Sequence, residues 1–353
     1  MNVLEIEDLR ILLRNGDRDV ALVDGVSLAV APGAVVGLAG ESGSGKTLTG
    51  LSALGFFPDR ARATGAVRFA GQDVLKMSQS RLRRMRGHQV AVVFQDPMTS
   101  LHPMLSVGRQ LTEHVEVHLG LSRSQARERA IELLETVRLP DPEHVLSSFP
   151  HQFSGGMRQR IAIASALACG PRLLIADEPT TALDVTVQAG ILRLIDRLRR
   201  DSDMAVLMIS HDLGVMSSLA DTLHVLYAGR VVESGPAGEL LTAPRHPYTR
   251  SLLDSLPDPT ERGADLRVIR GEPPPPDRRP PGCAFAPRCA FAEPRCTAAV
   301  PMLQPVAAGR AAACVVDPFV RSPATQAVDD RSETAFRHLG GTGASSLASE
   351  DGA

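Results

Sequence analysis

The feature that most constrains this chain is a glycine-rich octapeptide near its N-terminus. Residues 40–47 follow the pattern Gly-x-x-x-x-Gly-Lys-Thr, and Lys46 is one of only two lysines in the chain. In such a loop, backbone N–H groups surround phosphate oxygens, the lysine neutralises the terminal phosphates and the threonine hydroxyl binds Mg²⁺. The sequence therefore predicts a nucleoside-triphosphate site. Its phosphate-binding residues are Gly40, Glu41, Ser42, Gly43, Ser44, Gly45, Lys46 and Thr47.

Short apolar runs on either side of this loop predict an α/β fold with parallel central strands. The run 35–39 leads directly into the loop, and the segment 47–54 reads as a helix whose N-terminus faces the phosphates. Residues 3–7 alternate in the manner of an edge strand. Further buried strands are expected at 90–94, 173–176 and 205–209.

Polar side chains directly after these strands are the candidates for catalysis. Asp177 can hold Mg²⁺ and Glu178 can act as the general base toward an attacking water. His211 follows another strand, where a neutral imidazole could bond the γ-phosphate. The alternatives are a solvated acidic pair and a structural histidine, and both remain open when each motif is considered alone.

A helical pattern occupies about 100–160 and predicts a separate subdomain. Ser122 and Gln125 have the spacing of a capping box, whereas Pro97 and Pro103 are expected to exclude regular structure before it. The segment ends at Ser154, Gly155 and Gly156, which precede another helix, so their backbone amides are expected to face an anion.

Composition and charge exclude several classes of protein. A net charge of −2 argues against a protein that coats nucleic acid. Charged residues interrupt 1–30, so no secretory signal is predicted, and the sequence has no run of about 18 apolar residues that could span a bilayer. Any role at a membrane would depend on partner chains.

The amino-acid composition of the C-terminal part changes around a proline-rich connector at 271–281. Four cysteines follow the connector within a short segment. The fifth cysteine, Cys169, is interpreted as a buried thiol. Residues 317–353 are predicted to be disordered. A cytosolic setting disfavours disulfides, and the absence of a Cys-x-x-Cys pair weakens a zinc ribbon. From the residues alone, unligated thiols, zinc and an iron–sulfur cluster all remain possible at Cys283, Cys289, Cys296 and Cys314.

Two further segments resemble the ATP-binding cassette (ABC) superfamily. Residues 153–157 are similar to its signature sequence, and 180–184 are similar to the loop that contacts the second cassette. The resemblance implies a P-loop NTPase domain at 1–245, with a RecA-like core, a helical subdomain and ATP hydrolysis. It also implies that Ser154, Gly155 and Gly156 contact nucleotide on the opposite subunit, that Asp184 belongs to the dimer loop, and that Gln95 and His211 serve as the glutamine-loop and switch residues.

Within the superfamily, the chain resembles the ATPase subunits of oligopeptide and dipeptide importers. Residues 94–101 look like that group's glutamine loop, although His102 stands where asparagine is usual, and 246–249 resemble the start of its C-terminal extension, expected over 246–316. The resemblance implies a peripheral subunit on the cytoplasmic face of the cell (inner) membrane. Its partners would be two permeases, a second ABC ATPase and an extracytoplasmic solute-binding protein, with no nucleic acid. The alternatives are import of nickel or another small solute, and a soluble ABC ATPase outside transport.

The same resemblance bears on the cysteines. Residues 282–289 are similar to a segment that binds a [4Fe–4S] cluster in some peptide-importer ATPases. It implies iron–sulfur ligation by the four clustered cysteines, in addition to ATP and Mg²⁺ at the nucleotide site, with Mg²⁺ held by Thr47, Gln95 and Asp177.

Overall fold

The structure is a computed structural model that describes residues 1–181, 183–256, 268–316 and 318–319. Contacts divide the chain into two compact units. The first comprises Met1–Asp19, Val23–Val36 and Lys46–Ile209, and the second comprises Val20–Leu22, Gly37–Gly45 and the described chain from Ser210 onward. The expected boundary at 245 stays a prediction.

An antiparallel sheet forms the N-terminal part of the first unit. Its order is β2 (Arg18–Val30), β1 (Leu4–Asn15), β4 (Ala61–Phe69) and β5 (Gln72–Asp73). The prediction of an edge strand at 3–7 was wrong, because β1 lies between two other strands. Alternation identified a strand with one buried face, formed by Leu4, Ile6, Leu9 and Ile11, but it cannot specify the neighbours of that strand.

Three parallel strands make the apolar centre of the first unit. β7 (Leu173–Asp177) pairs with β6 (Val90–Val93) on one side and β8 (Ala205–Ser210) on the other. Every residue of β7 and β8 is buried, as expected for strands covered on both faces. The strands predicted at 90–94, 173–176 and 205–209 are therefore confirmed.

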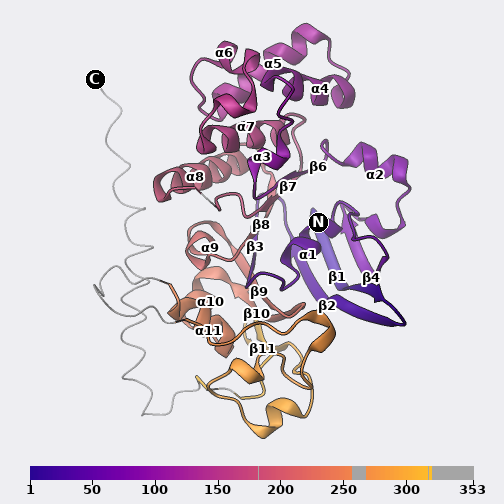
Figure 1. The fold of residues 1–353 in the computed structure, drawn as a ribbon, viewed down its shortest axis with the longest axis vertical. Helices are drawn as coiled ribbons and strands as arrows, with labels where there is room; N and C mark the ends of the chain where they lie inside the picture. The colour runs from indigo at the N-terminus through magenta and orange to yellow at the C-terminus, as the bar shows by residue number, and fades with distance from the viewer. Residues whose placement is uncertain (182, 257–267, 317, 320–353) are drawn as a thin grey trace. The chain divides into compact units, whose positions relative to one another are not determined.

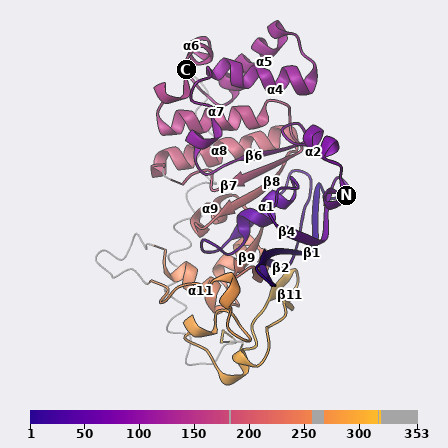
Figure 2. The same ribbon diagram turned by 45° about the vertical axis from the view of Figure 1, so that its right-hand side comes forward.

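The helices of the first unit include the group expected near 100–160. Figures 1 and 2 show α4, α5 and α6 gathered above α7, and α5 begins at the predicted capping box of Ser122 and Gln125. The bounds are α1 (Lys46–Ser52), η1 (Val74–Lys76), α2 (Gln79–Met85), α3 (Pro97–Ser100), α4 (Val107–Leu119), α5 (Arg123–Thr136), α6 (Pro142–Ser147), η2 (Pro150–Gln152), α7 (Gly155–Leu167) and α8 (Val185–Ser202).

The short helix α3 corrects an expectation. Pro97 was predicted to exclude regular structure, but it occupies the first turn of α3, where its missing N–H has no intrahelical partner to lose. Asp96 caps this turn and accepts a hydrogen bond from the Met98 backbone N–H at 2.8 Å.

The second unit contains an antiparallel sheet with helices beside it. Its strand order is β11 (Gln304–Ala307), β12 (Arg310–Ala312), β10 (Arg230–Pro236) and β9 (Thr222–Tyr227). β3 (Val35–Ala39) is wholly buried and leads into the glycine-rich loop. The remaining elements are α9 (Leu213–Leu219), α10 (Ala237–Thr242), α11 (Pro247–Asp254), η3 (Pro276–Arg278), η4 (Ala286–Arg288) and η5 (Pro294–Thr297).

A buried carboxylate links the C-terminal segment to this sheet. Glu233 of β10 is fully buried and accepts hydrogen bonds from the backbone N–H groups of Arg245 and His246 at 2.7 and 2.9 Å. Arg310 of β12 approaches the same carboxylate at 3.4 Å.

Apart from residues 318–319, the tail predicted to be disordered lies outside the described residues. None of the described helices combines the length and the hydrophobicity that a membrane-spanning segment requires.

Candidate functional site

The glycine-rich loop has a backbone that only glycine can adopt at critical positions. Gly40 has φ +140°, and a Cβ built there would lie 2.2 Å from the backbone oxygen of Leu226. Gly43 and Gly45 also have positive φ, at +76° and +99°. The Ser44 backbone oxygen accepts a hydrogen bond from Gly229 N–H at 3.0 Å. The loop is therefore held against the β9–β10 hairpin by close backbone contacts.

Helix α1 begins directly after the loop and carries two predicted site residues. Lys46 is buried, whereas Thr47 is exposed. The Thr47 hydroxyl donates to Oδ1 of Asp177 at 3.1 Å, although 130 residues separate the two. Two of the three predicted magnesium ligands are thus brought together. The third, Gln95, lies exposed in the turn after β6.

Asp177 lies in an environment that favours a cation. Burial is the main cause that raises the pKa of its carboxyl, and the charge of Glu178 raises it further. The hydrogen bond from Thr47 and the charge of Lys46 act in the opposite direction. A buried carboxylate beside a second carboxylate gains most from a divalent ion, so the oxygen donors of Thr47 and Asp177 fit Mg²⁺ chemically.

Glu178 leaves β7 with a strained backbone. Its φ is +48°, a value uncommon for a residue other than glycine, and its N–H donates to the Ile209 oxygen at 2.8 Å. The Thr181 hydroxyl donates to its Oε2 at 3.0 Å. Strain held in place by surrounding bonds is characteristic of functional positions, and here it fixes a half-buried carboxylate beside Asp177.

The predicted signature residues begin helix α7. Ser154 caps this helix and accepts a hydrogen bond from Met157 N–H at 3.4 Å. A Cβ at Gly156 would lie 2.7 Å from Cγ1 of Val187 in α8, while one at Gly155 would lie 3.6 Å from Leu183. Asp184, which is exposed, caps α8 through a 2.9 Å bond from Val187 N–H. The starts of α7 and α8 therefore lie against each other, with Ser154 and Asp184 accessible.

His211 belongs to the second unit, directly after β8. Its side chain is exposed, and the adjacent Asp212 caps α9 by accepting from Gly214 N–H at 2.7 Å. Asp212 also donates through its own N–H to the Ser210 hydroxyl at 3.0 Å. This turn fixes the backbone on either side of His211.

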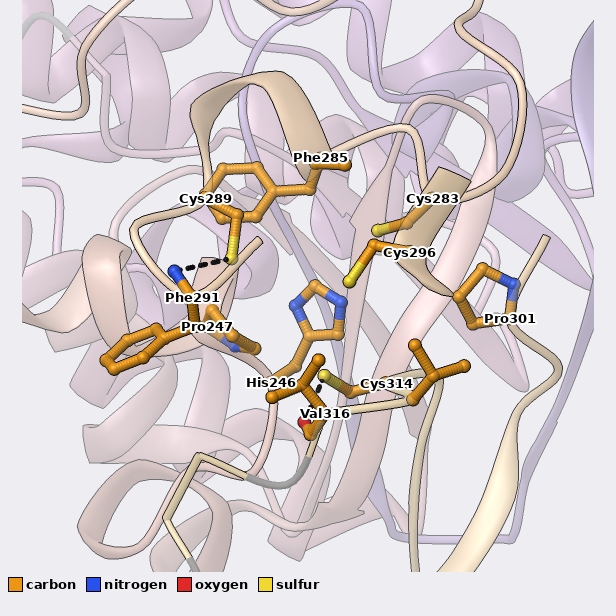
Figure 3. Close-up of a pocket in the computed structure, with 12 residues that line it drawn as sticks. His246, Pro247, Cys283, Phe285, Cys289, Phe291, Cys296, Pro301, Cys314 and Val316 are labelled. Atoms are coloured by element: carbon orange, nitrogen blue, oxygen red, sulfur yellow. Dashed lines mark hydrogen bonds between the residues drawn. The ribbon is translucent and has the colours of Figure 1, made fainter. Parts of the chain in front are cut away.

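The four clustered cysteines line a single small cavity in the second unit. Figure 3 shows their sulfur atoms around a space that also contains the ring of His246, and the cavity measures about 10 Å³. Burial is the main cause that raises the thiol pKa values of Cys283 and Cys289, and it raises that of Cys314 to about 11. The thiols of Cys283, Cys289 and Cys314 are therefore neutral at physiological pH when no metal is bound.

The cysteine cavity does not present a ready site for a single metal ion. Among the described residues, no three or more His, Cys, Asp or Glu side chains are close enough together to hold a metal ion. The donor chemistry of four thiols on one cavity suits a soft, thiolate-bound group. The arrangement of the side chains does not support the expected cluster beyond that.

Sequence reasoning missed two residues that contact the phosphate loop. Arg288 forms two hydrogen bonds to the carboxylate of Glu41, at 2.6 and 2.9 Å, and the Tyr248 hydroxyl accepts from Glu41 N–H at 2.7 Å. No local pattern could have revealed these contacts, since 247 and 207 residues separate the partners.

Comparison with known proteins identifies two matching families. The family described as ABC transporter matches residues 23–181, and the family described as oligopeptide/dipeptide transporter, C-terminal region, matches residues 232–296. A peptide import ATP-binding protein of Brucella abortus (strain 2308) is 48% identical over 313 residues, which cover 88% of this chain and 94% of that protein. The oligopeptide transport ATP-binding protein OppD of Salmonella typhimurium is 43% identical, covering 88% and 93%.

Solved structures of similar fold are also ABC proteins. The structure of cbiO1 from Clostridium perfringens, part of the ABC transporter complex cbiONQ, has a TM-score of 0.58 and 25% identity, covering 68% of this chain and 90% of that one. The ATP-binding cassette MJ0796, in a dimeric post-hydrolysis state bound to ADP and Pi, has a TM-score of 0.57 and 26% identity, covering 66% and 98%.

Proposed function

Because this chain belongs to the ABC transporter family, we propose that it is the ATP-hydrolysing subunit that powers import of di- and oligopeptides. The observation that carries the proposal is the contact between Thr47 and Asp177 at the start of α1, a hydroxyl–carboxylate pair suited to Mg²⁺. The names of the relatives and the C-terminal family match support peptides as cargo over nickel or another small solute.

In this proposal, each site residue has one task during phosphoryl transfer. The backbone N–H groups of the loop and the Lys46 ammonium bind the phosphates, and Thr47, Asp177 and Gln95 hold Mg²⁺. When bound, Mg²⁺ neutralises charge that develops on the phosphate oxygens. Glu178 accepts a proton from the attacking water, and His211 donates a hydrogen bond to the terminal phosphate.

A second cassette would complete each site. We propose that Ser154, Gly155 and Gly156 present the N-terminal amides of α7 to nucleotide bound by the facing subunit, with Asp184 at the contact between subunits. An accessible Ser154 and the accessible start of α8 support this role. ATP would close the pair, and hydrolysis would release it.

The proposal extends to the setting of the protein. Two permeases would form the path across the membrane, a second ABC ATPase would pair with this chain, and an extracytoplasmic binding protein would deliver the peptide. The chain would then lie peripherally on the cytoplasmic face of the cell (inner) membrane.

Reconstitution tests this function directly. The chain, its sister ATPase and the permeases encoded beside it should import labelled peptide into proteoliposomes in the presence of ATP and the binding protein. Glu178→Gln should slow hydrolysis at least ~10²-fold while ATP binding is retained, because only the proposed base is removed. Lys46→Ala should weaken ATP binding itself. Uptake of nickel but not peptide, or ATP hydrolysis that no permease stimulates, would contradict the proposed cargo or the transport role.

We also propose that Cys283, Cys289, Cys296 and Cys314 hold an iron–sulfur cluster. Their shared cavity supports this proposal, since thiolates are the usual ligands of such clusters. When bound, a cluster would cross-link the extension and require the four thiols to deprotonate. Anaerobically purified protein should then be brown and contain iron, and Cys289→Ser together with Cys296→Ser should remove the visible absorbance. Colourless wild-type protein without iron would reject the cluster, and stoichiometric zinc would replace it as the explanation.

A further inference from the structure

Arg288 joins the cysteine-bearing extension to the phosphate loop within the second unit. It lies in η4, directly before Cys289, and its side chain is only 6% exposed. Both of its terminal nitrogens donate to the carboxylate of Glu41, the second residue of the loop. The hydrogen bond to Glu41 is the main cause that raises the pKa of Arg288, so this guanidinium stays charged. The contact is a bidentate, charge-assisted pair, which is among the strongest side-chain interactions.

Other contacts fix the orientation of Arg288. Its Nε donates to the backbone oxygen of Arg270 at 3.0 Å, and a terminal nitrogen lies 3.3 Å from the Tyr227 hydroxyl. Tyr227 packs against Tyr248 with ring centroids 4.6 Å apart, and both rings contact Phe285 of the cysteine cavity. The contacts with Arg270 and Tyr227 therefore fix the position of the guanidinium that binds Glu41.

Tyr248 provides a second link to the same loop residue. Its hydroxyl accepts the Glu41 backbone N–H, so the extension holds both the main chain and the side chain of Glu41. Burial is the main cause that raises the pKa of Tyr248, which keeps this hydroxyl neutral. Glu41 therefore cannot move without breaking one of these bonds.

A carboxylate within a phosphate-binding loop has an electrostatic cost. The bound triphosphate is strongly anionic, so a free Glu41 carboxylate would repel it at close range. The bidentate contact with Arg288 neutralises that carboxylate and keeps it in one orientation. The arrangement thus removes a repulsion that the loop sequence would otherwise impose on ATP.

We propose that Arg288 is a positioning residue for ATP, through which the C-terminal extension sets the charge and shape of the phosphate loop. This inference rests on the proposed ATP-binding function. It adds that Arg288, a residue outside the cassette motifs, influences the affinity for ATP. Arg288 acts through Glu41 and need not touch the nucleotide. Its loss should therefore affect ATP binding more than the chemical step.

The test measures ATP affinity and turnover in the full-length protein. Arg288→Gln should weaken ATP binding by about tenfold or more, because the Glu41 carboxylate then loses the guanidinium that balances its charge. The KM for ATP should rise accordingly, while kcat at saturating ATP should change less than about threefold. Adding Glu41→Gln to Arg288→Gln should restore most of the affinity, since the repelling charge is then gone.

The rescue distinguishes positioning from a general role in folding. If Arg288 only stabilised the extension, the double variant would bind ATP as weakly as Arg288→Gln, because the contacts to Arg270 and Tyr227 stay lost. Arg278→Gln is the matched control, since that arginine lies in the same extension with 80% of its side chain exposed. If Arg288→Gln does not fold, Arg288→Lys provides the comparison with a smaller loss, because lysine keeps the charge but cannot form the bidentate contact. Wild-type affinity in Arg288→Gln, or no rescue by Glu41→Gln, would overturn the inference. Failure of wild-type protein to bind ATP would instead refute the proposed function.

Discussion

The most direct structural prediction concerns two glycines of the phosphate loop that differ in their surroundings. Alanine at Gly40 would need φ near +140°, a region that only glycine occupies readily, at a cost of about 1–3 kcal/mol. Its Cβ would also lie 2.2 Å from the backbone oxygen of Leu226, which cannot rotate away. Forced displacement of packed atoms typically costs a further ~1–3 kcal/mol. We expect Gly40→Ala to lower the free energy of unfolding by about 2–6 kcal/mol, a large part of the stability of an ordinary domain.

Gly43→Ala is the matched control within the same loop. Gly43 has φ +76°, but no atom lies within 4 Å of the Cβ position. Only the cost of a left-handed backbone applies, about 1–2 kcal/mol. The difference between the two variants therefore reports the crowding around the Gly40 Cβ, mainly by Leu226, together with the difference between the two backbone conformations.

Urea unfolding followed by circular dichroism provides the measurement, with and without MgATP. The unfolding midpoint of Gly40→Ala should fall well below that of Gly43→Ala. The stabilisation that ATP adds to Gly40→Ala should also shrink, because the loop must shift to relieve the clash. Equal midpoints for the two variants, or a loss below about 1 kcal/mol in Gly40→Ala, would refute the packing argument.

Three other expectations can be checked on the same protein. Asp177→Asn should raise the thermal unfolding midpoint of the nucleotide-free protein, because burial raises the pKa of Asp177 and its ionised form costs stability above that pKa. ATP hydrolysis by this variant should nevertheless fall at least ~10²-fold. A lower unfolding midpoint would contradict this reasoning. Burial lowers the pKa of His224 to about 4, so it contributes stability that is complete above pH 6.5 and lost as pH falls toward 4. Because the residue is partly accessible, we expect a loss of about 1–2 kcal/mol in urea titrations, and His224→Leu should remove that dependence. Gly156→Ala should be less stable than Gly155→Ala by about 1–3 kcal/mol in urea, since only the former clashes with Val187, and equal stabilities would count against the packing of α7 on α8.

Much of the nucleotide site could be predicted because its determinants are local. The glycine spacing of the loop, the apolar run before Asp177 and the capping signal at Ser122 each lie within a few neighbouring residues. Backbone conformation and strand burial depend mainly on such short patterns. For this reason the buried strands at 35–39, 90–94, 173–176 and 205–209 and the start of α5 were identified correctly.

Incorrect predictions came from general sequence rules that were applied without knowledge of the surrounding structure. Pro97 was expected to exclude a helix, yet proline is acceptable in a first turn, and Asp96 supplies the cap. The strand at 3–7 was assigned to an edge because alternation describes its two faces and not its neighbours. The resemblance implied an iron–sulfur cluster on four cysteines; the chain gathers them on one cavity, no group of three or more His, Cys, Asp or Glu among the described residues could hold a metal ion, and the cluster stays a proposal.

The glycine spacing of the loop, the buried parallel strands and the acidic pair after β7 could be identified in the sequence, since each depends on residues close together. The contacts of Thr47 with Asp177 and of Arg288 with Glu41 became known from the folded chain alone, because they join residues 130 and 247 positions apart. Chain folding brings such partners together through packing of whole elements, and the packing is not encoded in any one segment.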